Sequence, residues 1–446
     1  MNVRPTFPFT VTSRDVLRIA IPASLAFITE PLVGFTDITV IGRLGDAHLL
    51  GGLVLGALVF DFLFSLAYFL RMGTAGLTAQ AVGARDPRDG MLHAVRALVL
   101  AAVIGVAMIV LSPLLFWIAD VALAPQAGVR EALSLYFFIR IWGAPLVLIN
   151  YVMLGWFYGR AAATTGMTIQ IVLHGVNIVS CVLFVYGFHW GVAGAGLGTL
   201  LGEVVATITG LVLFVRHFGG IRPLLSQIRP GELREVRALR RLVGLNRDLM
   251  IRSAALMFAY AWFAAQGSRM GEVQLSANAV LLNQLMIVAY FLDGIAQAAE
   301  QLSGKALGAN YRPAFDAAYR LSFRIGFLIS FALGLLWYFG GDWAIGLMTT
   351  NEAVQRAAHD YLWIAAIGAL IFMPAFVYDG ILIGLTQNAV MRNVMVVSLA
   401  LFLAAALVLK IPFGNLGLWL SLHLWFIARG GLYWWALERR RAAIFA

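Results

Sequence analysis

The segment from Gly51 to Gln80 has the sequence GGLVLGALVFDFLFSLAYFLRMGTAGLTAQ, thirty residues with only two charged side chains. About 20 apolar residues are enough for an α-helix to cross the hydrocarbon core of a bilayer, so this segment predicts a membrane-spanning helix. The whole chain has the same character, because 61% of its 446 residues are hydrophobic and 12% are charged. Soluble domains have about 45–50% and about 25%, and a soluble globular fold is therefore nearly excluded.

Twelve segments of this kind occur in the chain, with ends defined to within a few residues. Long apolar runs indicate helices rather than the alternating strands of a membrane barrel. We therefore predict an all-α membrane protein with 12 transmembrane helices. The predicted spans are 15–42, 51–80, 92–118, 131–157, 167–187, 191–215, 247–267, 275–303, 316–339, 357–384, 392–411 and 414–436.

Basic residues are distributed unevenly between the loops that join these spans. The net charge of +10 comes from 32 Lys and Arg against 22 Asp and Glu, and most of the basic residues fall in alternate loops. Loops rich in Lys and Arg stay in the cytoplasm, so we expect an inner-membrane protein with both termini cytoplasmic. The charge indicates membrane topology, and no nucleic-acid partner is expected.

The two halves of the chain resemble one another at an almost constant offset. The duplication predicts an N-terminal six-helix lobe at 1–216, a basic cytoplasmic linker at 217–246 and a C-terminal six-helix lobe at 247–446. Because each lobe has an even number of spans, a pseudo-twofold axis along the membrane normal relates the two, and a site between them opens to either side in turn. The matching positions at offset 225 are Ala81-Val82-Gly83-Ala84 with Ala306-Leu307-Gly308-Ala309, Tyr136 with Tyr361, Gly143 with Gly368, and Gly159 with Gly384.

Asp37 is the most informative charged residue in the predicted spans. It lies in an apolar run from Pro31 to Gly42, with no basic residue within a helical turn. An ionisable group in hydrocarbon costs about 2.5–3.5 kcal/mol on insertion scales and is functional by default. Removal from water favours a protonated carboxyl group, so Asp37 is a candidate carrier of a proton or cation. The alternative is a helix-end carboxylate that reaches the interface near Arg43.

Three more charged residues lie in the first two spans. Glu30 precedes Asp37 by seven residues, which places both on nearly one helix face unless Pro31 kinks the helix between them. Asp61 and Arg71 carry opposite charges but are too far apart in one helix for direct contact. Each is expected to pair with another helix, and Arg71 is either a structural charge or a contact for an anionic substrate group.

Polar residues in the fifth and sixth spans are candidates for a hydrogen-bond network around an acid. Asn177 and Cys181 are four residues apart and share a face, and Thr199 offers a hydroxyl group. The alternative for Asn177 is a polar clip between helices. As the only cysteine, Cys181 forms no disulfide within the chain and no cysteine metal cage, and no metal site is expected.

A second group of acids lies in the other half. Asp293 and Glu300 are seven residues apart in the eighth span, and Asp379 lies in the tenth. They are the second-lobe candidates for proton or sodium binding. No Walker A, zinc-protease or nucleophile-elbow motif occurs in the sequence, and the absence of these motifs favours a secondary transporter over an ATP-driven pump or an enzyme.

Several runs resemble the multidrug and toxic compound extrusion (MATE) exporters. They are Asp37-Ile38-Thr39-Val40-Ile41-Gly42-Arg43-Leu44-Gly45, which begins fifteen residues after Pro22, and Gly191-Val192-Ala193-Gly194-Ala195. The runs from Phe69 to Gln80 and from Leu292 to Glu300 are similar to the DinF branch of that family. The resemblance covers essentially the whole chain and implies the V-shaped MATE fold.

The resemblance also implies roles for individual residues. Asp37 would be the first-half acid whose protonation bends the first helix near Pro22. Tyr136, Asn177 and Thr199 would be the hydrogen-bond neighbours of this acid. In several relatives a second aspartate follows the asparagine by four residues, where this chain has Cys181, and this difference favours proton coupling over sodium coupling. Asp379 resembles the second-half acid of the sodium-exchanging branch, but the matching seventh-span acid of that branch falls near Arg252 or Ser253 here.

The implied activity is export of amphipathic, often cationic, organic compounds by antiport. H+ or, as the less favoured choice, Na+ would be the coupling ion, with no other cofactor, and we expect a monomer that interacts with small molecules and the lipid bilayer. One alternative is a lipid-intermediate flippase of the same superfamily, with Arg71, Arg140 and Arg252 in a cationic cavity. A more remote one is a membrane enzyme on lipid or isoprenoid substrates, which needs an acidic metal motif that the sequence lacks.

Overall fold

The computed structural model of the protein describes residues 5–228, 231 and 236–445, without the side chains of 236–243, 245 and 246. The predicted linker at 217–246 therefore lies partly outside the described residues. All regular elements in the described part are helices, and ten helical segments there are long and apolar enough to cross a membrane. The prediction of an all-helical membrane protein is confirmed.

The helices follow one another with short connections. Those of the first half are α1 (Ser13–Gly42), α2 (Ala47–Ala67), α3 (Phe69–Gly83), α4 (Pro87–Val110), α5 (Ser112–Leu123), α6 (Ala127–Arg140), η1 (Ile141–Gly143), α7 (Ala144–Gly159), α8 (Ala163–Val182), η2 (Leu183–Gly187), α9 (Gly191–His217) and α10 (Ile221–Ser226). Those of the second half are α12 (Val236–Ser268), α13 (Glu272–Gly308), α14 (Arg312–Met348), α15 (Glu352–Gly384) and α16 (Asn388–Ile444).

Each predicted span coincides with one or more of these helices, and the differences are local breaks. Span 51–80 is formed by α2 and α3, which are interrupted at Tyr68, and span 131–157 by α6, η1 and α7. Spans 392–411 and 414–436 both fall in α16, whose 57 residues include the non-helical Gly414 with φ 55° and ψ −128°. A straight helix of that length would measure about 85 Å, far more than one bilayer crossing, so the break at Gly414 separates two spans.

Contacts divide the chain into two compact units. Unit 1 comprises the chain up to Ser24, Ala79–Arg85 and the chain from Gly244 onward, and unit 2 comprises Leu25–Thr78 and Asp86–Val243. Helices α1 and α3 each contribute residues to both units. Within α1 the division follows Ser24, two residues after Pro22. The lobe boundaries expected at residues 216 and 247 stay a prediction.

Local sequence signals explain where the helices begin. Asp46 accepts hydrogen bonds from the backbone N–H groups of His48 and Leu49 at the start of α2, at 2.8 and 3.4 Å. Asp86 caps α4, which has Pro87 in its first turn, and Asn351 caps α15. Such side chains satisfy backbone donors that have no partner within the helix.

The ends of corresponding helices repeat at offset 225. Arg85 and Asn310 follow α3 and α13 with φ 56° and 48°, and Ala161 and Thr386 follow α7 and α15 with φ 61° and 53°. A positive φ is uncommon in residues other than glycine. Its recurrence at equivalent positions of both halves supports the predicted duplication.

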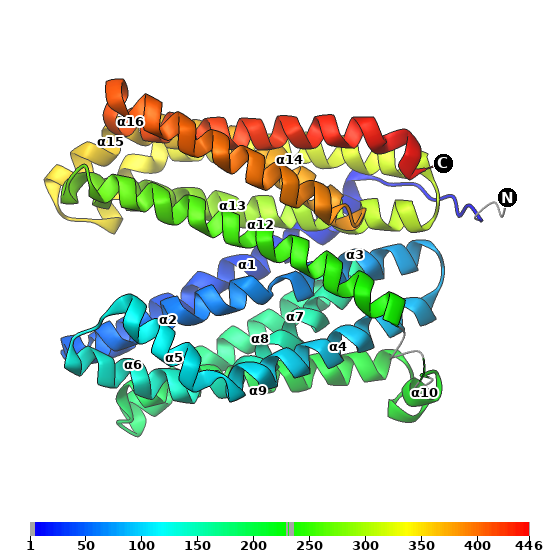
Figure 1. The fold of residues 1–446 in the computed structure, drawn as a ribbon, viewed down its shortest axis with the longest axis horizontal. Coiled ribbons are helices and arrows are strands. Elements are labelled where there is room, and N and C mark those ends of the chain that lie inside the picture. The colour runs from blue at the N-terminus through cyan, green and yellow to red at the C-terminus, as the bar shows by residue number, and fades with distance from the viewer. Residues whose placement is uncertain (1–4, 229–230, 232–235, 446) are drawn as a thin grey trace. The chain divides into compact units, whose positions relative to one another are not determined.

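One helix in each unit is central to its packing. Within unit 2, α9 packs against α6, α7 and α8, and within unit 1, α15 packs against α13, α14 and α16 (Figure 1). Side chains that α9 and α15 direct towards these neighbours are surrounded by protein. Thr199, Glu203 and Asp379 are all buried in this way.

Candidate functional site

Asp37 lies at the centre of a buried polar site in unit 2. Its side chain is 7% exposed, and the thiol group of Cys181 in α8, itself fully buried, is within hydrogen-bonding range of the carboxyl group. Tyr136 in α6 is also buried and interacts electrostatically with both Asp37 and Arg140. The structure therefore brings three helices and three of the residues discussed from sequence, Asp37, Tyr136 and Cys181, into one site.

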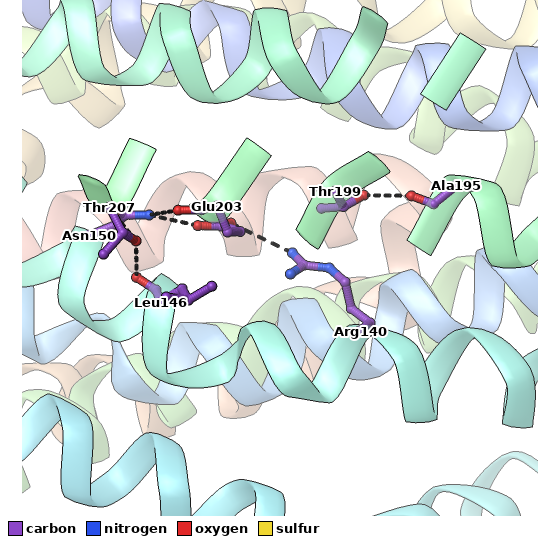
Figure 2. Close-up of polar contacts among 7 residues, drawn as sticks. All are labelled: Arg140, Leu146, Asn150, Ala195, Thr199, Glu203 and Thr207. Atoms are coloured by element: carbon purple, nitrogen blue, oxygen red, sulfur yellow. Dashed lines mark hydrogen bonds and ion pairs between the residues drawn. The ribbon is translucent and has the colours of Figure 1, made fainter. Parts of the chain in front are cut away.

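Asn177 lies on α8 with Cys181, and Thr199 lies on α9, which packs against α8. Asn177 is completely buried in α8, and neither atom of its amide group has a hydrogen-bond partner among the described residues. The Thr199 hydroxyl donates to the carbonyl oxygen of Ala195 in its own helix at 3.0 Å (Figure 2). The expected hydrogen bonds from these two residues to Asp37 stay a prediction.

Two glycines of α9 explain how α8 approaches the site. A Cβ atom on Gly198 would lie 2.7 Å from the backbone nitrogen of Cys181, and one on Gly202 would lie 2.8 Å from the carbonyl oxygen of Leu173 and 3.2 Å from Cβ of Asn177. No larger side chain fits at these distances without a shift of α8. The small residues of α9 thus determine where Cys181 and Asn177 are held.

A charged network extends from this site along α9. Arg140 and Glu203 form an ion pair at 3.8 Å, and the Glu203 carboxylate accepts a hydrogen bond from Asn150 at 2.8 Å (Figure 2). The Thr207 hydroxyl donates to the side-chain oxygen of Asn150 at 3.2 Å. Helices α6, α7 and α9 are therefore joined through four polar side chains in the interior of unit 2.

The other charged residues of the first two spans are connected to this network. Glu30 interacts electrostatically with Asp61, Arg71 and Glu203, and Asp61 also interacts with Arg140. Glu30 and Asp61 are exposed, whereas Arg71 is 7% exposed. The Arg71 guanidinium lies over the rings of Tyr68, Phe27 and Tyr158, at 4.6, 5.0 and 5.5 Å from their centroids. Cation–π contacts of this kind stabilise a desolvated guanidinium.

The membrane-embedded network of unit 2 contains more acids than bases. Its charged members are the carboxyl groups of Glu30, Asp37, Asp61 and Glu203 and the guanidinium groups of Arg71 and Arg140. Four carboxyl groups against two guanidinium groups leave two negative charges when all six are ionised. Asp37 and Glu203 are the buried acids of the network, and at these two an excess of negative charge favours the uptake of protons or of another cation.

Asp379, in unit 1, has two cationic partners. Its Oδ2 atom accepts a hydrogen bond from Arg252 at 2.5 Å and another from Arg429. These three residues come from α12, α15 and α16, and their exposures are 6%, 5% and 2% for Arg252, Asp379 and Arg429. The cluster carries one excess positive charge, which is the reverse of the network in unit 2.

Asp293 and Glu300, the other two second-lobe candidates, both lie on α13. Asp293 is partly buried and interacts electrostatically with Tyr260, a residue that also interacts with Arg429. Glu300 is 3% exposed and packs with its backbone against Gly384 of α15. The structure therefore places Asp293 near the arginine cluster and Glu300 at the contact of α13 with α15.

Several members of these networks were not among the candidate residues from sequence. Glu203 and Arg429 carry opposite charges within predicted spans, and an interior charge of either sign is a signal for a partner in another helix. Asn150 and Thr207 give no comparable signal, because uncharged polar residues are frequent where membrane helices pack. In the described part of the chain, no group of three or more His, Cys, Asp or Glu side chains is arranged to hold a metal ion.

Comparisons with known proteins agree with this architecture. A sequence model of the MatE family matches residues 22–183 and again residues 249–413. The DNA damage-inducible protein F of Escherichia coli K12 is 34% identical over 432 residues, which cover 97% of this chain and 93% of that protein. The multidrug export protein MepA of Staphylococcus saprophyticus is 24% identical over 222 residues, which cover 49% of this chain and 48% of that protein.

The fold is also similar to that of a solved structure. An outward-facing multidrug resistance MATE family transporter of the MOP superfamily superposes with a TM-score of 0.88 at 19% sequence identity, covering 98% of this chain and 99% of that chain. At this level of identity the likeness concerns the fold alone.

Proposed function

Because the chain belongs to the MatE family, whose members are transporters and not enzymes, we propose that it exports amphipathic cationic compounds by alternating access, coupled to proton antiport through Asp37. The predictions of a MATE family member and of a protein that is not an enzyme are confirmed by the family. The coupling ion, the substrate class and the roles of individual residues belong to the proposal. In it the protein is a monomer in the inner membrane with both termini in the cytoplasm, and it uses no cofactor besides the coupling ion.

The excess of carboxyl groups in unit 2 is the observation that carries the proposal. A cationic substrate and a proton both compensate the same negative charge, so binding of one disfavours binding of the other. Asp37 is the acid of this network that is buried beside neutral side chains, Cys181 and Tyr136, rather than in a close ion pair. Its proton occupancy is therefore the one most free to change during transport.

The proposed cycle uses the two protonation states of Asp37. With Asp37 ionised, unit 2 attracts the cationic substrate. Protonation from the periplasmic side removes one negative charge, weakens the attraction and releases the substrate. Pro22 lacks the backbone N–H that would complete the helical hydrogen bonding of α1, and the division between the two units follows it by two residues. These features support a bend of α1 at Pro22 when Asp37 changes its charge.

The arginine cluster of unit 1 supports proton coupling over sodium coupling. A sodium ion at Asp379 would lie beside two guanidinium groups, because Oδ2 of Asp379 already accepts from Arg252 and Arg429, and their positive charge would repel it. In unit 2 the residue four positions after Asn177 is Cys181, and a thiol is a poor ligand for a hard cation such as Na+. Both observations favour H+ as the coupling ion.

Efflux of ethidium from proteoliposomes tests the proposal. Transport is measured under an imposed pH gradient and, separately, under an imposed sodium gradient. We expect the wild-type protein to transport ethidium under the pH gradient alone and Asp37→Asn to lose this activity. Asp120→Asn is the matched control, since it makes the same chemical change at the exposed pair of Asp120 with Arg130, and it should transport like the wild type.

Two results would contradict the proposal. Sodium-driven efflux that survives Asp37→Asn would move the coupling site to Asp293 and Asp379 in unit 1. The absence of transport under both gradients would argue against export of organic cations and would favour a lipid-intermediate flippase, which is tested next with fluorescent lipid in the same vesicles.

A further inference from the structure

His423 occupies an unusual position in the interior of unit 1. It lies on α16, past the break at Gly414, and is 5% exposed. Its Nδ1 atom is 2.8 Å from the carbonyl oxygen of Trp419, one turn earlier in the same helix. Its Nε2 atom is 3.0 Å from the carbonyl oxygen of Ile364 in α15. Both ring nitrogens therefore face hydrogen-bond acceptors.

Both contacts are hydrogen bonds only when the ring carries a proton on each nitrogen. A neutral imidazole has one N–H group, so its second nitrogen presents a lone pair, whereas an imidazolium donates from both nitrogens. A backbone carbonyl oxygen has no hydrogen to give. In the neutral form either Trp419 or Ile364 would therefore face a lone pair at hydrogen-bonding distance, and a buried polar contact would be lost.

The surroundings of the ring are shaped to allow both contacts. A Cβ atom on Gly368 would lie 3.4 Å from Nε2 of His423, so the ring packs directly against α15 one turn after Ile364. The ring centroids of Phe372 and Trp419 lie 5.6 and 6.4 Å from that of His423. The His423 ring therefore packs among aromatic side chains.

Burial disfavours a positive charge on the ring, and the groups that stabilise this charge are carbonyl dipoles rather than a carboxylate. Among the described residues, the polar contacts of the ring are the two carbonyl groups. Ionisable side chains elsewhere on the packed helices include Asp293 and Glu300 on α13, Asp360, Tyr361 and Asp379 on α15, Arg429 and Tyr433 on α16, Arg252 and Tyr260 on α12, and the exposed pair of Asp342 on α14 with His359 on α15. With no carboxylate to fix the charge, the proton occupancy of the ring depends on pH.

We propose that His423 is a second proton-binding site of the protein, held as an imidazolium by the carbonyl oxygens of Trp419 and Ile364. Loss of the proton from Nε2 removes the hydrogen bond to Ile364 and so weakens the contact between α15 and the segment of α16 that follows Gly414, whereas loss from Nδ1 removes only the bond within α16. The inference does not rest on the proposed function, because Asp37 and its network belong to unit 2 and His423 belongs to unit 1.

Nitrogen NMR of the intact protein in liposomes tests the site. The protein is labelled with ¹⁵N at its seven histidines, and spectra are recorded from about pH 5 to about pH 8, the range in which histidine changes its charge. His423→Gln assigns the signals by their loss. Gly368→Ala provides a second assignment in case the first variant does not fold, since the added methyl group meets Nε2 at 3.4 Å and shifts that signal.

The expected result is a pair of protonated ring nitrogens for His423 in the acidic part of the range, replaced by one bare nitrogen as the pH rises. His174 is the matched control, because it is buried in α8 and neither of its ring nitrogens has a hydrogen-bond partner in the described part of the chain; it should be neutral throughout. A bare nitrogen on His423 at every pH would overturn the proposal. The titration should persist in Asp37→Asn, so failure of proton-coupled transport and failure of this site are distinguishable.

Discussion

The same contact between two helices occurs once in each unit, and the two copies differ in the charges around them. In unit 2 a Cβ atom on Gly155 of α7 would lie 2.4 Å from the carbonyl oxygen of Arg71 in α3. In unit 1 a Cβ atom on Gly380 of α15 would lie 2.0 Å from the carbonyl oxygen of Ala296 in α13. Each residue of the second pair follows its counterpart by 225 positions, so the duplication extends to the backbone packing.

The polar side chains on these equivalent helices have diverged. At offset 225, α7 has Asn150 and Leu154 where α15 has Ala375 and Asp379. Asn150 donates a hydrogen bond to Glu203 in the acidic network of unit 2, and Asp379 forms an ion pair with Arg252 in the arginine cluster of unit 1. The comparison teaches that glycine positions determine how the helices pack, whereas the charged groups, which are not repeated, give each unit its own electrostatic character.

The largest expected effect is a difference in stability between variants of the two buried aspartates, Asp379 and Asp37. Asp379→Asn leaves two buried guanidinium groups without an anion, and breaking a buried ion pair costs about 3–5 kcal/mol. Asp37→Asn removes an acid from a network with excess negative charge, so its cost to stability is expected to be much smaller. Thermal unfolding of the purified variants in detergent measures both.

A matched variant shows whether the unpaired charges cause the loss of stability in Asp379→Asn. Replacing Asp379 by leucine and both arginines by methionine removes the charges together, and such replacements are often neutral or stabilising. We expect this triple variant to recover most of the stability that Asp379→Asn loses. Equal unfolding temperatures for Asp37→Asn and Asp379→Asn would show that the two units do not differ in this way.

The next effect tests the close helix contact that is repeated within each unit. Alanine at Gly155 or Gly380 forces a methyl group against a backbone carbonyl, and overpacking of this kind costs about 1–3 kcal/mol. Gly380→Ala should lower the unfolding temperature more than Gly155→Ala, because its Cβ atom would lie 2.0 Å rather than 2.4 Å from the carbonyl oxygen. Gly175→Ala is the control, since a Cβ atom there meets no other group within 4 Å. If all three variants unfold at the same temperature, the helices adjust freely and the packing argument is wrong.

Much of the fold follows from sequence for two physical reasons. Long apolar segments must be helical in a bilayer because their backbone groups find partners only within the helix, and this requirement predicts spans such as 51–80 without further information. The repeated glycines at Gly159 and Gly384 then indicate the duplication. The break of α16 at Gly414 is also visible, because Pro412 precedes it. What sequence does not define is the local interruption at Tyr68, since no proline or glycine marks it.

The candidate site is less predictable, because the partner of a charged side chain depends on how helices rotate against one another. Asp37 is identifiable from its cost in hydrocarbon. The pairing of Arg252 with Asp379 joins residues 127 positions apart, and no spacing rule indicates it. The two carbonyl contacts of His423 cannot be predicted from the sequence either, since they depend on backbone atoms that every residue has.

A smaller effect tests the uncharged part of the network in unit 2. Thr207→Val removes the hydroxyl group that donates to Asn150 and leaves a buried acceptor unsatisfied, which costs about 1–3 kcal/mol. Its counterpart in unit 1 is Leu432, so the interaction has no equivalent there. Thr209→Val is the control on the same helix, because that hydroxyl donates to the carbonyl oxygen of Val205 within α9 rather than to another helix of the described chain. A loss of stability in Thr209→Val as large as that in Thr207→Val would assign the effect to the helix rather than to the network.

The smallest effect concerns an ion pair at the surface, which contrasts with the pair at Asp379. Arg130 in α6 donates from Nε to Oδ1 of Asp120 in α5 at 2.7 Å, and this hydrogen bond lowers the pKa of Asp120. A carboxyl group with a lowered pKa stabilises the folded state above its unfolded value of about 3.9, and this contribution is lost as the pH falls through the lower, folded value. Asp120→Asn should therefore unfold at a slightly lower temperature than the wild type at neutral pH, and the difference should vanish in strong acid.

Salt separates this exposed pair from the buried one. Ions screen charges that face water far more than charges inside the protein, so 1 M salt should abolish the small effect of Asp120→Asn and leave that of Asp379→Asn almost unchanged. A difference for Asp120→Asn that persists in acid and in salt would mean that Asp120 acts through its shape or its contacts with α5, not through its charge. A strong salt dependence for Asp379→Asn would mean that water reaches the arginine cluster, and the electrostatic contrast between the two units would then be one of accessibility as well as of sign.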